Sequence, residues 1–410
     1  MKKNRRRPQP VLDPLYLTAR AAAAELSISQ ATLYAYVSRG LIRSEPIEGE
    51  ARGRRYRAED VRRLKNRRAP LVVQGEGLKA SDLPIMDTAV STITEDGPVY
   101  RGVLATSLAE SATFEQTATL LWDARNDPFI KANVPIISPA MRLMLDASDR
   151  AQPIDRAVAV LSLATDSDPS AYNATPEGRA TTGAKILRLV VAAMLRTQPK
   201  PTPIHEQIVQ AWALSHPHAG ELIRRVLVLL ADHELNASTF TVRCAASTGI
   251  SLYDAVIAGL VALKGPRHGG VGPQASRLLE TLLAGDAEAI IRERVALGER
   301  FPGFGHMVYG DRDPRALSIF EGLWKAGSID ERMTMYIPHW ISEATGQFPN
   351  CDYALAVMRH ALDMPKGSET TMFAMARTAG WIAHASEQLQ SKKLIRPRAR
   401  YVGPAPAVKR

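Results

Sequence analysis

Cysteine is almost absent from this chain of 410 residues, since only Cys244 and Cys351 occur. Two cysteines so far apart form neither a disulfide framework nor a zinc cluster. Long apolar runs are also missing, because the longest, near residues 255–263, is far shorter than the roughly 20 residues of a membrane-spanning helix. The basic N-terminus lacks the apolar core of a secretory signal. We therefore expect a protein that is not a membrane protein, a secreted protein or a metalloprotein, and that works in the reducing cytoplasm.

The positive charge of the chain is confined to one end. Residues 1–70 contain 17 Lys or Arg against 7 Asp or Glu, an excess that equals the net charge of the whole chain, +10. The remaining residues are balanced, with 35 of each sign. Such asymmetry favours an anionic partner for this segment alone, most plausibly nucleic acid. A solubilising tail is the alternative.

The basic segment also contains ordered elements. Thr18 can cap a helix over residues 19–26, which is rich in alanine, the best helix former. Ser29 can cap a second helix over residues 30–39, which Gly40 ends. A glycine-centred basic turn then predicts a hairpin wing, and a third short helix is expected to close the unit.

These elements are those of a DNA-reading module, in which the second helix enters the major groove and wing arginines neutralise phosphates. The stretch from Tyr16 to Val61 resembles the winged helix-turn-helix of MerR-type and excisionase-type proteins. We expect residues 1–70 to form a domain that binds duplex DNA, with a module kept only for packing as the alternative. The expected contacts are Gln30, Thr32, Tyr34 and Arg39 of the second helix and Arg52, Arg54 and Arg55 of the wing.

The rest of the chain has the apolar spacing of helices. Phe114, Thr117, Ala118 and Leu121 form one such stripe, and the breaks between runs fall at glycine and proline. Strands are expected only near residues 85–90 and 98–100. No glycine pattern of a nucleotide site follows a strand. The sequence predicts an all-α fold for this part.

Three histidines lie in unusual settings. His233 belongs to a polar cluster between apolar helices, and glycines flank His268 and precede His306. Glycines leave room for a ligand to approach the backbone. Taken singly, each histidine could instead be a satisfied buried residue.

Four further charged residues extend this set. They are Arg315, Asp352, Arg377 and Arg396. Asp352 could be a solvated helix cap, Arg377 could pair with a structural carboxylate, and Arg396 could belong to a solvated tail. Together they suggest a small polycarboxylate held by arginines, with imidazoles and no metal at its reacting carbonyl.

Six ordered motifs carry a family resemblance. They are His-Glu-Leu-Asn-Ala-Ser-Thr-Phe (233–240), Gly-Pro-Arg-His-Gly-Gly (265–270), Gly-Phe-Gly-His (303–306), Asp-Pro-Arg (313–315), Asn-Cys-Asp (350–352) and Gly-Trp-Ile-Ala-His (380–384). Residues 83–403 thereby resemble the citrate synthase family. The resemblance implies a large helical domain over 78–269 and 363–410, a small one over 270–362 that closes over the substrates, and a homodimer.

The resemblance also implies a reaction, the condensation of acetyl-CoA with oxaloacetate to citrate and CoA in the tricarboxylic acid cycle. Asp352 would remove the methyl proton, His268 would donate a hydrogen bond to the thioester oxygen, and His306 would polarise the ketone. The oxaloacetate carboxylates would be held by His233, Arg315, Arg377 and, from the second subunit, Arg396. No cofactor beyond the acyl-CoA substrate is implied.

Two alternatives stay open. One is a 2-methylcitrate synthase that uses propionyl-CoA, and the other is a DNA-binding regulator whose synthase-like body senses metabolites. Gly310 stands where the family usually has a basic residue for CoA phosphates, and Arg312 is a nearby substitute.

Overall fold

The computed structural model describes residues 16–26, 30–38, 42–46, 53–58, 60–61, 86–148, 150–310, 312–327, 329–399 and 402–403. The chain divides into two compact units, Met1–Ile85 and Met86–Arg410. Each unit is described by itself below.

The first unit contains a three-stranded antiparallel sheet in the order β1 (Tyr16–Thr18), β3 (Arg54–Arg57), β2 (Ser44–Pro46). Strands β2 and β3 form the expected wing. Helices α1 (Ala19–Glu25) and α2 (Gln30–Ser38) precede the wing, and the Thr18 side chain accepts a hydrogen bond from the Ala21 amide at 3.2 Å, as expected of a cap.

A small apolar core holds this unit together. It consists of Ala22, Ala23, Leu26, Leu33, Tyr36, Ile42, Tyr56 and Val61. So small a core supplies little stabilisation, because the energy scales with the apolar area removed from water. The cap at Ser29, the stop at Gly40 and most of the third helix lie outside the described residues.

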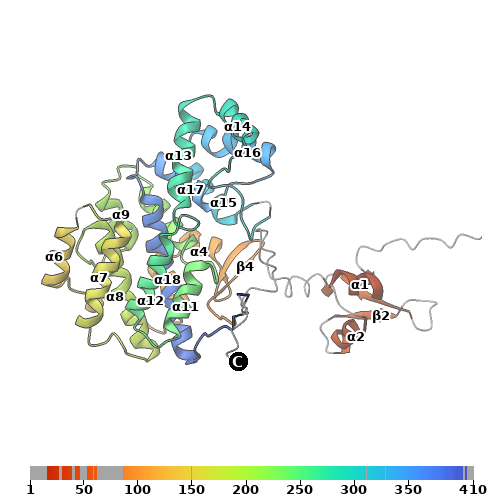
Figure 1. Cartoon of the computed structure of the whole chain (residues 1–410), viewed down its shortest axis with the longest axis horizontal. Helices are drawn as coiled ribbons and strands as arrows, with labels where there is room; N and C mark the ends of the chain where they lie inside the picture. The colour runs from red at the N-terminus through yellow and green to blue at the C-terminus, as the bar shows by residue number, and fades with distance from the viewer. Residues whose placement is uncertain are drawn as a thin grey trace, which may run out of the picture. The chain divides into compact units, whose positions relative to one another are not determined.

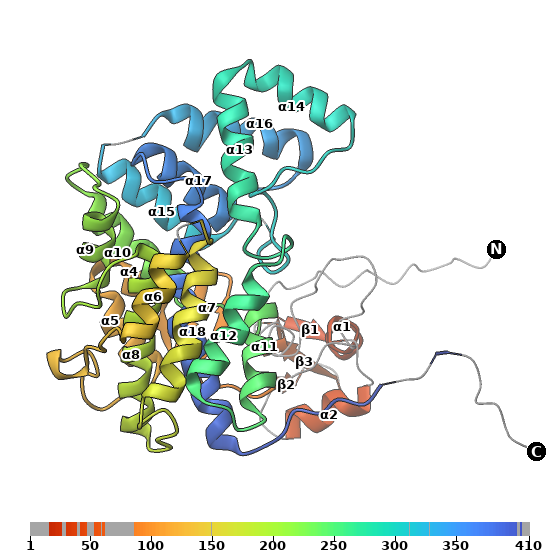
Figure 2. The same cartoon turned by 60° about the vertical axis from the view of Figure 1, so that its left-hand side comes forward.

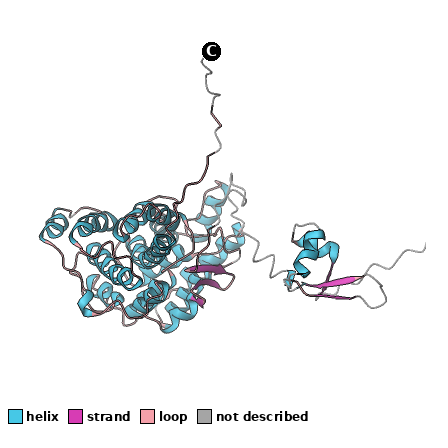
Figure 3. Ribbon diagram, turned by 90° about the horizontal axis from the view of Figure 1, so that it is seen from below, coloured by secondary structure: helices cyan, strands magenta, loops and turns pink. Residues whose placement is uncertain are grey.

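The second unit is almost entirely helical, which confirms the predicted fold class (Figure 3). Its helices are α4 (Ala105–Ser111), α5 (Phe114–Leu121), α6 (Pro139–Ala147), α7 (Pro153–Ser167), α8 (Pro176–Leu195), α9 (Ile204–Ala211), α10 (Ala219–Leu229), α11 (Ala237–Ala246), α12 (Leu252–Leu263), α13 (Val271–Ala284), α14 (Ala287–Ala296), α15 (Pro314–Lys325), α16 (Ile337–Thr345), α17 (Cys351–Ala361) and α18 (Ser368–Ser391). A 3-10 turn (Lys131–Asn133) and a π-helical turn (Arg332–Tyr336) complete the helical elements of the described residues.

One small antiparallel sheet joins them, with the strand order β4 (Ser91–Thr94), β5 (Gly97–Tyr100), β6 (Val103–Leu104). The strand expected near residues 85–90 was wrongly placed, since β4 begins at Ser91. The reason is the two-residue turn between Thr94 and Gly97, which pair directly and so set the register of the hairpin. Helical spacing elsewhere was read correctly.

Helix α18 forms the centre of this unit and packs against α8, α11 and α12 (Figure 2). Its Trp381 is fully buried. Gly259 of α12 allows the close approach, because a Cβ there would lie 2.7 Å from the Trp381 ring. Truncating so large a buried side chain costs about 3–5 kcal/mol of stability.

Helices α13 to α17 gather at one end of the second unit, and α7, α8 and α12 lie at the other (Figure 1). The division into a large domain (78–269 and 363–410) and a small one (270–362) stays a prediction. Among the described residues, no helix combines the length and apolar character needed to cross a membrane.

Candidate active site

The loop that carries His233 is anchored by buried hydrogen bonds. The Tyr100 hydroxyl of β5 donates to the carbonyls of Leu229 and Asp232, at 3.0 and 3.1 Å. The Asp232 carboxylate accepts hydrogen bonds from the Ser91 hydroxyl and from the Glu234 amide, the latter at 3.0 Å. These bonds hold Glu234 in the left-handed region, at φ 53°, which a non-glycine residue rarely adopts.

His233 itself is buried and faces two aromatic rings. Its Nε2 lies 3.1 Å from the Tyr309 hydroxyl, and its ring centroid lies 5.4 Å from that of His306. Burial, together with the positive charges of Arg315 and Arg377, lowers the pKa of His233 well below its ordinary value. His233 is therefore a neutral imidazole at physiological pH.

His306 is oriented by the backbone of its own loop. Its Nδ1 accepts hydrogen bonds from the amides of Val308 and Tyr309, at 3.0 and 3.3 Å, so the one proton of the neutral ring is on Nε2. Burial and the nearby Arg315 lower the pKa of His306 to about 4. Arg315 Nη2, which is always a donor, lies 3.2 Å from that Nε2. Two donors therefore face the same space, where an oxygen acceptor can bind both.

Arg315 is fixed by a buried carboxylate. Its Nε and Nη2 donate to the two oxygens of Asp313, at 3.0 and 2.8 Å. Asp313 also accepts a hydrogen bond from the Cys351 amide, at 3.0 Å. Burial alone would raise the pKa of Asp313, but the Arg315 charge and hydrogen bonds hold it below its ordinary value. Asp313 thus joins the start of α15 to the start of α17.

Arg377 is the arginine of this site whose donors are least satisfied. It is fully buried in the middle of α18, where Nε donates to the Leu230 carbonyl at 3.0 Å. Nη1 and Nη2 are buried and find no hydrogen-bond partner among the described residues. A buried guanidinium with two unpaired nitrogens is costly unless an anion completes it. A carboxylate matches its two parallel donors.

His268 is oriented by a hydroxyl that the sequence analysis did not single out. Its Nε2 lies 2.8 Å from Ser238 Oγ, which also accepts a hydrogen bond from Trp381 Nε1 at 3.2 Å. Ser238 Oγ also lies 3.0 Å from Asn236 Oδ1, so its one proton goes either to that oxygen or to His268 Nε2. When it goes to Nε2, the ring proton is on Nδ1, which is then a donor. Burial and the charge of Arg377 lower the pKa of His268 to about 4. The signal was the position of Ser238 within the His233 motif.

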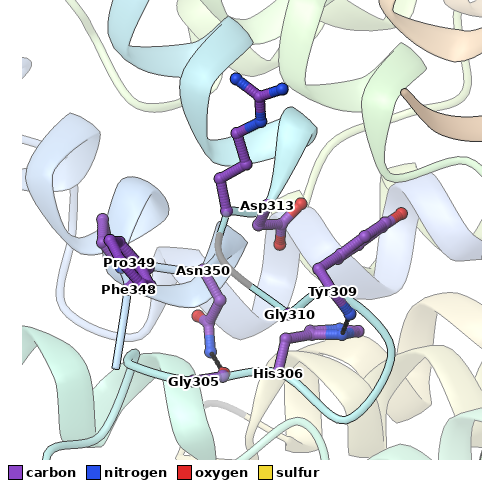
Figure 4. A pocket seen from close by; sticks show the side chains of 9 residues that line it. Gly305, His306, Tyr309, Gly310, Asp313, Phe348, Pro349 and Asn350 are labelled. Carbon is purple, nitrogen blue, oxygen red and sulfur yellow. Dashed lines mark hydrogen bonds between the residues drawn. The ribbon is translucent and has the colours of Figure 1, made fainter. Parts of the chain in front are cut away.

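Asp352 lies in the first turn of α17. Asn350 caps this helix, since its Oδ1 accepts the Asp352 amide at 2.9 Å, and its Nδ2 donates to the Gly305 carbonyl at 2.8 Å. Asn350 thereby ties the Asp352 turn to the His306 loop (Figure 4). Burial raises the pKa of Asp352 to about 6, despite the opposing charge of Arg315. Raised carboxyl and lowered imidazole pKa values in one site are typical of acid–base chemistry.

A pocket opens beside His306 (Figure 4). It is lined by Gly305, His306, Tyr309, Gly310, Arg312, Asp313, Phe348, Pro349 and Asn350. Gly310 borders open space, since a Cβ there would meet nothing within 4 Å. Arg312 is exposed, so a basic group does border the pocket, although position 310 lacks one. No cluster of metal-ligating side chains occurs among the described residues.

Arg396 lies apart from the groups above. It is exposed in the segment after α18, and its expected role depends on a second subunit. The structure therefore brings His233, Arg315, Arg377, His268, His306 and Asp352 into one unit, and the role of Arg396 stays a prediction.

The expected DNA-binding residues of the first unit differ in their exposure and contacts. Gln30 and Tyr34 are exposed on α2, and Arg54 is exposed on β3. Arg55 is engaged, because its guanidinium stacks 4.1 Å from the centre of the Tyr16 ring and lies 3.2 Å from Glu45. Arg39, Arg52 and the side chain of Thr32 lie outside the described residues.

Comparisons with known proteins also divide the chain into two parts, between residues 71 and 77. Residues 77–398 match the family model of the citrate synthase C-terminal domain, and residues 17–71 match that of the MerR helix-turn-helix regulatory proteins. Citrate synthase 2 of Bacillus subtilis (strain 168) is 31% identical over 77% of this chain and 93% of that protein. A 2-methylcitrate synthase of Mycobacterium tuberculosis is 28% identical over 84% of this chain and 96% of that protein.

Solved structures match to a similar extent. The crystal structure of citrate synthase from Thermotoga maritima MSB8 aligns with a TM-score of 0.67 at 25% identity, over 80% of this chain and 96% of that one. The alignment with the citrate synthase of Pyrobaculum aerophilum has the same TM-score and covers 92% of that chain.

Proposed function

This chain belongs to the citrate synthase family of acyl-transferring enzymes, and we propose that it condenses acetyl-CoA with oxaloacetate to form citrate and CoA. The observation that carries the proposal is Arg377, whose two unpaired buried nitrogens call for a carboxylate. Neutral imidazoles beside it provide donors for carbonyl oxygens. The site needs no cofactor beyond the acyl-CoA substrate.

Oxaloacetate is activated by the paired donors. Arg377 and Arg315 bind its carboxylates with help from His233, and the ketone oxygen lies between His306 Nε2 and Arg315 Nη2. The alkoxide that forms there is stabilised by donors already in place, which is the largest single contribution in many enzymes. Because the Nδ1 of neutral His306 accepts two backbone amides, its Nε2–H is available to donate a hydrogen bond to this oxygen.

Acetyl-CoA is activated by Asp352 and His268. Asp352 removes a methyl proton while the Nδ1–H of His268 stabilises the enol oxygen. The enol carbon forms the new bond to the ketone carbon, and water then cleaves the thioester to release CoA. A base with a pKa near 6 matches neutral pH better than an ordinary carboxyl.

The test is CoA release from oxaloacetate with acetyl-CoA or propionyl-CoA. We expect faster release from acetyl-CoA, and loss of release in Asp352→Ala but not in Glu293→Gln, an exposed carboxylate of α14. A higher kcat/KM for propionyl-CoA would make the protein a 2-methylcitrate synthase. Tight oxaloacetate binding with no release from either donor would leave the metabolite-sensing regulator.

A homodimer completes the site in this proposal, with Arg396 entering from the partner subunit. Mixing two inactive variants, Arg396→Ala and Asp352→Ala, then restores activity, because a mixed dimer contains one intact site. About a quarter of the wild-type rate is expected after full subunit exchange. No restoration would place Arg396 in its own subunit's site, and an active Arg396→Ala variant would place it outside any site.

DNA binding by the first unit is a second function, favoured by the match to MerR regulators. Gln30 and Tyr34 of α2 face solvent, and Arg54 of the wing is exposed, although its guanidinium donates to the Ser44 hydroxyl and carbonyl at 3.0 and 3.3 Å. A dimeric enzyme would present two such modules, as a palindromic operator requires. The test is binding of the full chain to a mixed-sequence duplex. Affinity should fall steeply with salt and weaken in Arg54→Ala but not in Arg267→Ala. No affinity at low salt would exclude this function.

Both functions fit a cytoplasmic protein, in which Cys244 and Cys351 stay reduced. These two thiols are free in the structure.

A further inference from the structure

A buried carboxylate outside the proposed chemistry joins three helices of the second unit. Glu369, at the start of α18, is 2% exposed. Its Oε1 accepts a hydrogen bond from the Ser276 hydroxyl of α13 and lies 3.1 Å from Arg359 Nε of α17. Its Oε2 is buried and has no hydrogen-bond partner among the described residues. Burying a carboxylate with one unpaired oxygen costs free energy, so the position of Glu369 needs an explanation.

Each of the three helices carries one member of this cluster and, on the same face, a residue of the active site or one next to it. Helical side chains four, seven or eight residues apart share a face. On α17, Arg359 follows Asp352 by seven residues. On α18, Arg377 follows Glu369 by eight residues.

The third helix completes this arrangement. On α13, Ser276 follows Gly272 by four residues, just after the loop of His268. The neighbouring Thr370 adds to the connection, because its hydroxyl donates to the Gly269 carbonyl at 2.9 Å.

The cluster also lies next to the proposed base. A Cβ built on Gly272 would be 3.0 Å from Glu369 Cβ and 3.8 Å from Asp352 Oδ1. The Glu369 stem and the Asp352 carboxylate therefore flank the same glycine. A rotation of α17 that loosened Arg359 from Glu369 would move Asp352 at once.

We propose that Glu369 is a positioning residue, which holds α13 and α17 against α18 and thereby fixes Asp352 relative to His268 and Arg377. This inference rests on the proposed condensation, because it takes Asp352 as the base. Errors of about 1 Å in such placements cost on the order of a hundredfold in rate.

The test compares two glutamates that bind the same arginine. Glu280 of α13 pairs with the Arg359 Nη2, is 44% exposed and makes no described contact with α18. We expect Glu369→Gln to lower kcat roughly ten- to hundredfold. Its dissociation constant for oxaloacetate should stay within twofold, and the deuterium isotope effect with methyl-deuterated acetyl-CoA should rise. Glu280→Gln should leave all three unchanged.

Hydrogen–deuterium exchange separates this inference from the condensation itself. If the wild type releases no CoA, the condensation fails, but the starts of α13 and α17 should still exchange faster in Glu369→Gln than in Glu280→Gln. If Glu369→Gln does not fold, Ser276→Ala removes the hydrogen bonds of that hydroxyl to Glu369 and Arg359 and keeps the ion pair between those two residues. Wild-type kcat and exchange in the variant, or a parallel loss of oxaloacetate affinity, would overturn the proposal.

Discussion

Arginines of the two units differ in burial and in how many of their nitrogens lack a hydrogen-bond partner. In the first unit, Arg55 is partly exposed, stacks on Tyr16 and pairs with Glu45, and only its Nε is buried without a described hydrogen-bond partner. In the second, Arg377 is fully buried, and two of its nitrogens have no described partner. An exposed pair costs and contributes little, whereas a buried guanidinium with unpaired nitrogens is costly unless an anion completes it. Burial and hydrogen bonding thus indicate which arginine binds a small anion.

The largest effect is expected at Arg377. Arg377→Met should weaken oxaloacetate binding at least a hundredfold, since a buried charge pair is lost. The ligand-free variant should lose little stability, because two buried nitrogens with no described hydrogen-bond partner are removed together with the Leu230 bond and the attraction to Asp232. Calorimetry and thermal denaturation measure the two effects.

Arg243 provides the matched control for that prediction. It is equally buried, but its donors bind Gln388 and Glu387, at 3.1 and 2.6 Å. Arg243→Met should therefore lower the melting temperature and leave oxaloacetate affinity unchanged. If both variants behaved alike, the contrast between satisfied and unsatisfied arginines would have no functional meaning.

A smaller effect is expected at Ser238. Ser238→Ala removes the hydroxyl that, in the proposed mechanism, donates to His268 Nε2 and keeps the ring proton on Nδ1, so kcat should fall about tenfold or more. Thr241→Ala on the same helix is the control, because that hydroxyl is bonded only to the Ala237 carbonyl among described residues, at 2.8 Å. Equal rates for the two variants would show that the tautomer does not depend on Ser238.

The pH dependence should differ between the units. Asp352, with a pKa raised by burial to about 6, works as a base only when ionised, so kcat should rise with pH up to that value and then level off. About a tenfold loss is expected between pH 7 and pH 5. His268 and His306, with pKa values near 4, stay neutral across this range. A flat profile would exclude Asp352 as the base.

Between pH 6 and 8, DNA binding by the first unit should not depend on pH, in contrast to the kcat of the second unit. The hydrogen bond from Tyr16 and the charges of Arg55 and Arg57 hold the pKa of Glu45 below its usual range. Its ion pairs therefore stay intact there, and affinity for duplex DNA should be constant.

The smallest effect is expected at Glu45, which lies 3.2 Å from Arg55 and 3.6 Å from Arg57. Glu45→Gln releases both arginines and removes a negative charge that repels phosphates. Affinity for duplex DNA should rise a few-fold, with the salt slope steeper by about one. Fluorescence anisotropy at two salt concentrations measures this. An unchanged slope would indicate that these arginines do not face DNA.

Sequence reasoning identified the helical body, the wing and the residues of the six motifs, because these depend on local spacing. It misplaced the first strand of the second unit, where turn geometry decided the register. It could not find Glu369, since no motif marks that residue and its partners Ser276 and Arg359 lie on other helices. Nor could it assign the roles of Ser238, Asp232 or Tyr309, which are defined by contacts between distant segments.

The sequence alone determined the class of the fold, the confinement of the charge to residues 1–70 and the identity of the candidate groups. Only the tertiary structure decided which nitrogens of Arg377 remain unpaired, which nitrogen of His306 holds its proton and why the pKa of Asp352 rises. Protonation and pairing depend on burial and on neighbours far away in the chain, such as the Leu230 carbonyl, 147 residues before Arg377. No local pattern encodes those neighbours, because packing alone brings them together.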